Sequence, residues 1–330
     1  MPGSPSSSIM DQNATNSTQG HCGLSEMPAR TFFVSVYSLV FLASLALNSI
    51  AIYVYFCKSA SQSSITVYLK NLVIADLFVC LCLILRIIKF ASTSVEIQRI
   101  YCIFGAPASY LNMYSSILFM GYIAANRYMR IVRPLETHML QTVRSTRYIC
   151  IVTWAVLLCL LCVYIAVFVS SDKENTPNTF TVFLSCESFH NSLLKRIYLV
   201  MHILCFLVFL SVLVSLILFY WGNVQRLRQA QRTMPEKPGN TQLSKSKRNM
   251  RVLVAVFCVC FVPYHMVRLP HTFISPLLHD CTAAQAFYII KELTVLLAVL
   301  NASLDPLIYF VFCKTFRAQL NLQRFQQRNQ

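Results

Sequence analysis

Charged residues are scarce in this chain. Of its 330 residues, 56% are apolar and only 12% are charged, about half the charged share of an ordinary soluble domain. A soluble globule needs a charged surface, and this composition cannot supply one. It therefore excludes a disordered protein and an ordinary cytosolic enzyme.

Glycine is also scarce, and the motifs of soluble enzymes are missing. Seven glycines among 330 residues exclude a collagen-like fibre and a glycine-rich linker protein. The sequence contains no P-loop, GxGxxG, HExxH or GxSxG motif, and its seven histidines lack metal-ligand spacing. We therefore expect neither an enzyme nor a resident cofactor.

Long apolar runs dominate what is present. Crossing the hydrocarbon core of a bilayer takes about 20 residues of helix. Runs of this length cover residues 31–57, 67–90, 100–126, 148–171, 197–225, 252–275 and 284–313. They are continuous rather than alternating, which does not fit the strands of an outer-membrane barrel. Because backbone groups in lipid must bond within their own segment, the sequence predicts an all-α membrane protein, a seven-transmembrane helix bundle.

The distribution of basic residues predicts the orientation of the bundle. With an extracellular tail at 1–30, a bundle at 31–313 and a short cytoplasmic tail at 314–330, 19 of the 28 lysine and arginine residues lie toward the inner side. Asn13 and Asn16 begin glycosylation triplets, which agrees with an extracellular N-terminus. We expect a multi-pass protein of the plasma membrane whose basic face contacts anionic lipid rather than nucleic acid.

Four cysteines fall on the predicted outer side, namely Cys22, Cys102, Cys186 and Cys281. The extracellular space is oxidising and permits disulfide bonds there. Four cysteines allow three pairings, and their spacing does not choose among them.

Two carboxylates lie deep within predicted spans, Asp76 and Asp305. An ionisable residue at that depth is costly and indicates a functional role. Ser116, Asn301 and Ser303 lie at compatible depths. Together these side chains either hold a cation, with allosteric sodium as the expected ion, or form a structural hydrogen-bond network.

The outer halves of the spans combine cations with aromatic and imidazole side chains. Arg268 and Lys291 lie at the depth of Tyr110, Tyr114, Tyr198, Tyr264, His202, His265 and His271. A guanidinium presents a planar fork of donors that fits phosphate or carboxylate, and tyrosine stacks on flat rings. This pattern predicts a pocket for an anionic, ring-bearing ligand. We expect Arg86, Lys89, Lys195 and Arg196 to extend to the membrane interface instead.

Short motifs along the spans carry a resemblance to a known family. They are Asn48, LVIAD (72–76), Asn126-Arg127-Tyr128, Trp154, FCVCFVPYH (257–265) and DPLIY (305–309). This set resembles the rhodopsin-like (class A) G-protein-coupled receptors. The stretches YLKNLVIADL (68–77), YLNMY (110–114), FVPYHMVRLP (261–270) and KELTVLLAVLNASLDPLIYF (291–310) are similar to P2Y-type purinergic receptors, in the branch that responds to ADP and UDP-sugars and includes orphan relatives.

The resemblance implies several features of structure and signalling. It implies the disulfides Cys102–Cys186 and Cys22–Cys281, a short amphipathic eighth helix, and coupling to inhibitory G proteins. The residues that it assigns to activation and G-protein coupling are Asn126, Arg127, Tyr128, Phe261, Pro263 and Tyr309. Together with the outer-half pattern, it gives a ligand-binding set of Tyr110, Tyr198, His202, Tyr264, His265, Arg268, Lys291 and Glu292.

These observations predict a receptor for an extracellular nucleotide such as ADP, UDP or a UDP-sugar. A lysophospholipid such as lysophosphatidylserine is an alternative ligand, because its headgroup would use the same cations while its acyl chain entered between helices. A constitutively active orphan receptor is a further alternative. A small-molecule transporter is a distant one, since the sequence lacks internal repeats and interrupted paired helices.

Asn126 stands where the family usually has an acidic residue, which weakens the ionic contact that holds Arg127 in the resting state. We predict that Asn126→Asp lowers basal G-protein signalling, because the new carboxylate can pair with Arg127. Basal signalling at matched surface expression is the measurement. Equal signals from the two proteins would contradict the prediction.

Overall fold

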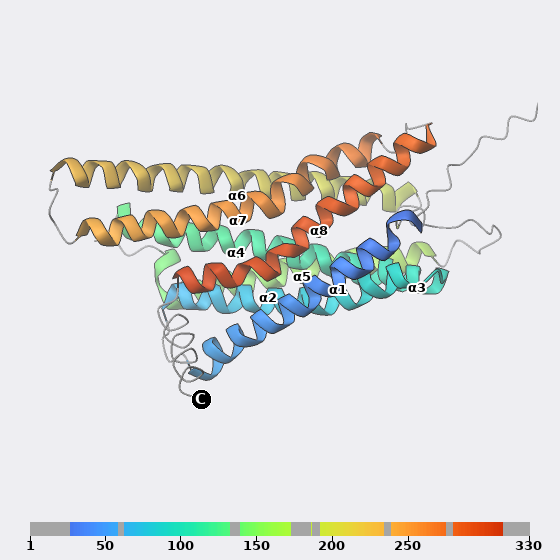
Figure 1. Ribbon diagram of the computed structural model, residues 1–330, viewed down its shortest axis with the longest axis horizontal. Coiled ribbons are helices and arrows are strands. Elements are labelled where there is room, and N and C mark those ends of the chain that lie inside the picture. Colours follow the sequence, from blue (N-terminus) through green and yellow to red (C-terminus); the bar gives the residue numbers. More distant parts are fainter. Residues whose placement is uncertain are drawn as a thin grey trace, which may run out of the picture.

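The computed structural model describes residues 27–58, 63–132, 139–172, 186, 192–233, 239–274 and 280–312, and this part of the chain is helical (Figure 1). Seven helices of 26 to 42 residues lie alongside one another. They are α1 (Met27–Ile52), α2 (Ser64–Ala91), α4 (Ala106–Val132), α5 (Val143–Asp172), α6 (Ser192–Thr233), α7 (Gly239–Ile274) and α8 (Cys281–Phe312). The short elements are η1 (Tyr53–Lys58), α3 (Val95–Ile100), η2 (Tyr101–Gly105) and η3 (Met139–Gln141).

These helices correspond to the seven predicted spans, and α8 is the seventh of them. The amphipathic eighth helix predicted for the C-terminal tail lies outside the described residues. So does the N-terminal tail up to residue 26. Both therefore stay predictions.

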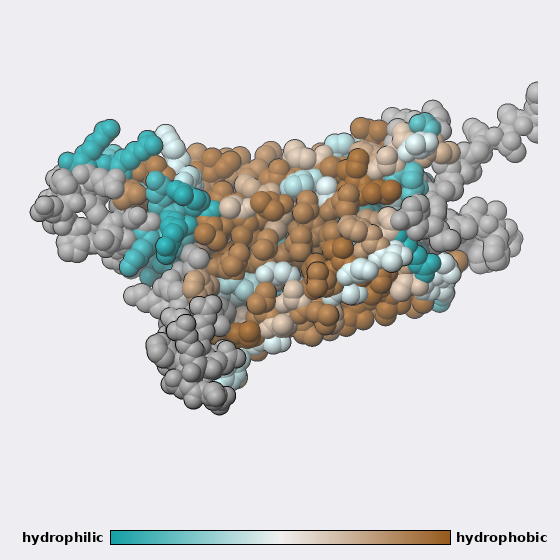
Figure 2. All heavy atoms as spheres, in the orientation of Figure 1, coloured by the Kyte–Doolittle hydropathy of each residue, from teal (hydrophilic) through white to brown (hydrophobic). Residues whose placement is uncertain are grey.

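The bundle has an apolar belt between two more polar ends (Figure 2). In the described ranges, six helices are long and apolar enough to cross a membrane: α1, α2, α5, α6, α7 and α8. Side chains of α5 and α6 are mostly exposed along the belt, whereas about half of those in α2 and α8 are buried. The chain is thus a multi-pass membrane protein.

The helix α4 is not among these six apolar spans, although the sequence analysis predicted a span there. It packs against α2, α5, α6 and α7 and buries polar side chains, including Asn112, Ser115 and Ser116. A helix that is surrounded by protein meets other helices rather than lipid, so it tolerates more polar residues than a peripheral helix. Its central position explains why it is less apolar than the six other long helices.

The helices α6 and α7 are longer than their apolar runs. The predicted spans ended at 225 and began at 252, but α6 continues to Thr233 and α7 begins at Gly239. The extensions carry basic residues and project beyond the other helices in Figure 1. Charge ends a membrane span without ending a helix, because lysine and arginine are good helix formers.

The outer end of the third span also differs from the prediction. The expected single helix from residue 100 is instead α3, a π-helical turn η2 and then α4. Cys102 in η2 is bonded to Cys186, and Tyr101 packs with Phe168 and Leu194 beneath this bond. The disulfide thus attaches Cys186, which follows α5 in the chain, to the π-turn at the outer end of α4.

Aromatic rings fill the centre of the bundle. The ring of Phe209 on α6 stacks on Phe257 of α7 with an interplanar angle of 2°. Pro263 lies inside α7 and Pro306 inside α8. Proline removes one helical hydrogen bond and bends a helix at that point, so both helices have a built-in site for a bend below the outer cavity.

Gly222 of α6 allows the ring of Tyr128 to pack against it. A Cβ atom at this glycine would lie 2.5 Å from Tyr128 Cε2, and the Tyr128 ring is stacked on Phe219 with centroids 4.9 Å apart. We expect Gly222→Ala to destabilise the protein by about 1–3 kcal/mol, since the ring must leave its stacked position.

The measurement is the midpoint of thermal unfolding in detergent. Gly121→Ala is the matched control, because its Cβ would lie 3.1 Å from the nearest atom, a methyl carbon of Val212. We expect a smaller decrease for this control. A midpoint for Gly222→Ala at or above that of the natural protein would show that Tyr128 yields freely.

Candidate functional site

A cavity of about 100 Å³ lies among the outer halves of α2, α4, α7 and α8, with Cys186 in its wall. The predicted ligand residues that line it are Tyr110, Tyr198, Tyr264, Arg268, Lys291 and Glu292. Sites for small molecules usually enclose about 300–1,000 Å³. A ligand of that size therefore requires the walls of this cavity to move apart.

Four cationic side chains line the cavity. Arg86 and Lys89 come from α2, Arg268 from α7 and Lys291 from α8. All are buried, with exposed fractions of 5%, 6%, 8% and 7%. Among the described residues of the wall, Glu292 is the single carboxylate. In the described part of the wall, four buried cationic side chains thus lie around one carboxylate.

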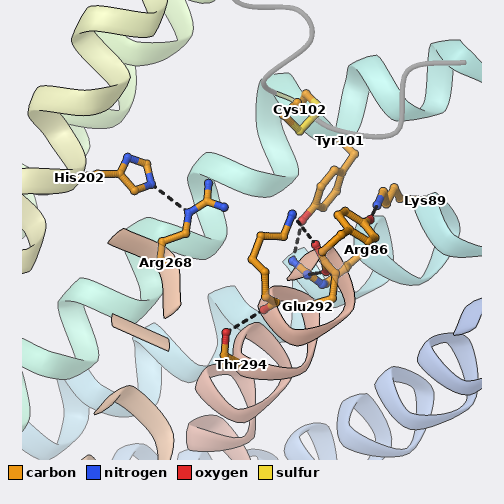
Figure 3. Close-up of polar contacts among 11 residues, drawn as sticks. Arg86, Lys89, Tyr101, Cys102, His202, Arg268, Glu292 and Thr294 are labelled. Atoms are coloured by element: carbon orange, nitrogen blue, oxygen red, sulfur yellow. Dashed lines mark hydrogen bonds and ion pairs between the residues drawn. A yellow bond between two sulfur atoms is a disulfide. The ribbon is translucent and has the colours of Figure 1, made fainter. Parts of the chain in front are cut away.

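Glu292 bridges two of the cations (Figure 3). One carboxylate oxygen accepts a hydrogen bond from Arg86, and the other lies 3.1 Å from Lys291 Nζ. Arg86 also donates to the hydroxyl of Tyr101 at 2.6 Å, and its guanidinium lies 4.9 Å from the ring centroid of Tyr37. The bridge connects α2 to α8 across the wall of the cavity.

Arg268 lies apart from this bridge, on the side of α6 (Figure 3). Its Nε donates to His202 Nε2 at 3.3 Å, and its guanidinium carbon lies 5.5 Å from the ring centroid of Tyr198. His202 Nδ1 in turn donates to the backbone carbonyl of Tyr198 at 2.8 Å. These contacts hold the guanidinium at the cavity wall, where it can bind an anion.

Two predicted ligand residues, His202 and His265, do not line the cavity. His202 lies behind Arg268. The ring of His265 stacks on Phe209 with centroids 3.8 Å apart, and its Nε2 is 3.1 Å from the hydroxyl of Tyr114. Both were chosen by depth along the helix, and depth alone does not determine the direction of a side chain. In the structure His202 lines the neighbouring apolar groove, and His265 lines neither hollow among the described residues.

The expectation that Arg86 and Lys89 extend to the membrane interface was wrong. Both are buried, and Lys89 Nζ lies 3.3 Å from the hydroxyl of Tyr288 on α8. Their three-residue spacing places them on one face of α2. An acidic residue at the outer depth of the last span, Glu292, was the signal that could have identified a basic partner on a neighbouring helix.

A second, apolar hollow begins beside the cavity. This groove of about 260 Å³ lies between α4, α5 and α6 and is lined by leucines, Met201 and Val208. Tyr110, Tyr164 and Tyr198 line both the groove and the cationic cavity. The two hollows therefore share a wall of three tyrosines.

The predicted polar core lies below the cavity. Asp76 and Asp305 are fully buried and adjacent. The Tyr309 hydroxyl donates to Asp76 Oδ2, and Asn301 Nδ2 donates to Asp305 Oδ2 at 2.9 Å. Four buried oxygens of this polar core have no hydrogen-bond partner among the described residues: Asp76 Oδ1, Asp305 Oδ1, Asn301 Oδ1 and Ser116 Oγ.

Ser303 was predicted to belong to this polar core, but it hydrogen-bonds toward α1. Its hydroxyl lies 2.6 Å from that of Ser44, and the nearby Asn48 amide donates to the backbone carbonyl of Ala302 at 2.8 Å. These bonds join α1 to α8. We therefore assign Ser303 a contact between helices rather than a place among the oxygens around the two aspartates.

At the inner end, Asn126 and Arg127 point to different partners. The amide of Asn126 donates to Ser64 Oγ at 3.0 Å and to the backbone carbonyl of Leu140. Arg127 Nη2 donates to the backbone carbonyl of Phe312 at 3.2 Å. Arg127 is thus held at the last turn of α8, where the helix dipole is negative and favours a cation.

The remaining predicted activation residues lie along α7 and α8. Phe261 is fully buried, and its backbone carbonyl accepts a hydrogen bond from His265 Nδ1 at 2.8 Å. Pro263 follows two residues later, and Tyr309 stacks edge-on against Tyr55 at 5.7 Å. Phe261 and Tyr309 both belong to the main buried cluster of the bundle.

Among the outer cysteines, Cys102 is bonded to Cys186 as the resemblance implies. Cys281 is also disulfide-bonded. Its predicted partner, Cys22, lies outside the described residues, as do the glycosylation acceptors Asn13 and Asn16. That pairing and the glycosylation therefore stay predictions.

Comparison with known proteins agrees with this architecture. A family model described as 7 transmembrane receptor (rhodopsin family) matches residues 47–309. P2Y purinoceptor 14 of Bos taurus is 29% identical over 94% of this chain and 90% of that protein. G-protein coupled receptor 87 of Mus musculus is 30% identical, with 97% and 88% covered. P2Y purinoceptor 13 of Homo sapiens is 30% identical, with 87% and 80% covered.

Proposed function

This chain belongs to the rhodopsin family of seven-transmembrane receptors, in its P2Y-like branch, and we propose that it is a plasma-membrane receptor for an extracellular anionic ligand. Members of this family signal through G proteins and are not enzymes. Its N-terminus is extracellular in this proposal, which agrees with the basic residues on the long inner ends of α6 and α7.

The cationic cavity is the observation that carries the proposal. The wall gathers four buried cationic side chains from three helices, and Glu292 is the single carboxylate among its described residues. Phosphate or carboxylate groups of a ligand are attracted to such a cluster and accept hydrogen bonds from it. Arg268 and Lys291 contribute donors from α7 and α8, and Tyr110 offers a ring for stacking from α4.

A nucleotide is the first ligand candidate. Its phosphates match the cations, and its base matches the tyrosine wall. Two of the relatives above are named purinoceptors. ADP, UDP and UDP-sugars are the members of this class that we would test.

A lysophospholipid is the second candidate, and the apolar groove favours it. A phosphate headgroup would bind the same cations, while the acyl chain would pass the wall of Tyr110, Tyr164 and Tyr198 into the groove between α4, α5 and α6. The two candidates share the anionic group and differ in what the rest of the molecule contacts.

Signalling would proceed by a change in the bundle. Ligand binding favours an arrangement in which α7 swings about Pro263, and this opens an inner site near Arg127 and Tyr309 for a heterotrimeric G protein of the inhibitory class. A ligand shifts this equilibrium only by its difference in affinity between the two states. A chain that signals without ligand is the remaining alternative.

Arg268→Ala tests the ligand site. We expect it to reduce ligand potency about 10- to 100-fold, because hydrogen bonds between charged groups contribute about 1.5–3 kcal/mol. G-protein activation is measured in cells with ADP, UDP, UDP-glucose and lysophosphatidylserine. Lys195→Ala is the matched control, since Lys195 is an exposed cation at the outer start of α6.

The response pattern separates the candidates. A nucleotide response that Arg268→Ala removes supports the first candidate, and a response to the lipid alone moves the ligand to the second. No response to the four compounds, together with a high basal signal, would support a receptor that acts without ligand. Equal losses for Arg268→Ala and Lys195→Ala would contradict a specific site.

We also propose that sodium binds in the polar core and favours the resting state. Four buried oxygens of Asp76, Asp305, Asn301 and Ser116 lack hydrogen-bond partners in the described part of the chain. Two adjacent carboxylates cannot both be charged in a low-dielectric site unless a cation lies beside them. Oxygen ligands are the type that a hard cation such as sodium prefers.

Raised sodium is therefore expected to weaken agonist binding, and Asp76→Asn is expected to abolish that effect. Agonist binding is measured across sodium concentrations, with choline chloride keeping the ionic strength constant. An agonist affinity that stays the same at every sodium concentration in the natural protein would contradict sodium binding in the core.

A further inference from the structure

The carboxylate of Glu292 binds two cationic side chains of the cavity that the proposed ligand would also contact. Both of its oxygens are engaged, one by Arg86 and the other by Lys291 at 3.1 Å. The side chains of the three residues are only 6–8% exposed. Within the described wall of the cavity, this carboxylate is the single anion.

We propose that Glu292 is a built-in competitor for the anionic group of the ligand. In the ligand-free receptor its carboxylate bridges Arg86 and Lys291, and on binding an anion of the ligand replaces it on at least one of these cations. This inference rests on the proposed function, because it concerns the same cavity, and it assigns Glu292 a regulatory role rather than a contact that adds affinity.

The carboxylate of Glu292 is covalently attached to the cavity wall, which favours it over a free anion. A group attached inside the same cavity competes as an intramolecular ligand, with an effective concentration on the order of millimolar or above. Coulomb attraction is also strong in this buried site, where the effective dielectric constant is far below that of water. A weak or singly charged anion therefore cannot displace Glu292, whereas a phosphate-bearing ligand with several charges can. The bridge acts as a filter for charge number.

The size of the cavity agrees with this role. The bridge links α2 to α8 across the wall, and the enclosed volume is about 100 Å³. Replacing the bridge with a ligand anion removes this ion pair between the two helices and leaves the weaker contact of Lys89 with Tyr288. Ion exchange at Glu292 and enlargement of the cavity are then one event.

The experiment measures anion binding directly on the purified full-length receptor in detergent. Inorganic pyrophosphate is the probe, because it carries the anionic group without a base or an acyl chain. Its binding is read as the rise in the thermal unfolding midpoint with pyrophosphate concentration, against sodium chloride at matched ionic strength. No signalling is required, so the result does not depend on ligand identity or on G-protein coupling.

Three variants are compared with the natural protein. Glu292→Gln removes the competing charge and keeps the shape of the side chain. Lys89→Gln/Glu292→Gln removes one charge of each sign, so the cavity keeps the excess charge of the natural protein. This variant is expected to fold even where the single variant loses stability. Glu96→Gln is the control, since Glu96 is an exposed carboxylate on α3, paired only with Arg99 at 3.9 Å among the contacts of the described residues.

We expect Glu292→Gln to lower the half-saturating pyrophosphate concentration about tenfold, which corresponds to about 1.4 kcal/mol. The charge-matched double variant is expected to show a gain in the same direction, and Glu96→Gln none. A double variant that binds no better than the natural protein would mean that only net charge matters, and this would overturn the proposal. Failure of pyrophosphate to stabilise any variant would also overturn it, whether or not the receptor responds to a nucleotide or a lipid.

Discussion

A hydrocarbon solvent provides no hydrogen bonds and does little to screen charge, and the arrangement of polar groups in this receptor depends on that constraint. Each buried ionisable side chain must find a partner inside the protein. Arg86 finds Glu292 across the bundle, and Asp76 finds Tyr309 and the neighbouring Asp305. These polar contacts connect α2 to α8 at two depths. The same pair of helices therefore carries both the ligand cavity and the polar core.

The central position of α4 follows from the same constraint. Its polar residues are excluded from lipid, so the more apolar helices α5 and α6 stand between it and the membrane. This arrangement places Tyr110 in the wall of the cavity and Arg127 at the inner end of one continuous helix. A change in the tilt of the helices around α4 can thus alter the contacts of α4 at both faces of the membrane.

Two of the polar links between helices in this bundle are non-covalent. The Glu292 bridge is an ion pair between helices rather than a covalent link, and Arg127 is held by a backbone carbonyl of Phe312. By contrast, the disulfide between Cys102 and Cys186 is a covalent link at the outer end of α4. A covalent link and a non-covalent one therefore lie at the same end of the bundle.

How much could be predicted from the sequence differs between the fold and the site. The apolar runs predicted seven helices because the length of a span is a property of the local sequence. The motifs around Asp76, Arg127 and Asp305 identified the family for a similar reason. The burial of Arg86 and Lys89 was missed, because it depends on Glu292, which lies some 200 residues later in the chain. The positions of His202 and His265 outside the cavity wall depend on Arg268 and Phe209 on other helices.

The sequence by itself determined that the chain lies in a membrane, how many spans it has and which family it belongs to. Each of these follows from short stretches of residues and does not depend on contacts with distant parts of the chain. Only the tertiary structure decided which cations meet which carboxylate, because helix rotation and tilt set the direction of each side chain. The physical reason is that a buried charge is positioned by its partner, and the partner comes from another helix. The cavity, its internal counter-ion and the groove beside it therefore belong to the packing of the bundle.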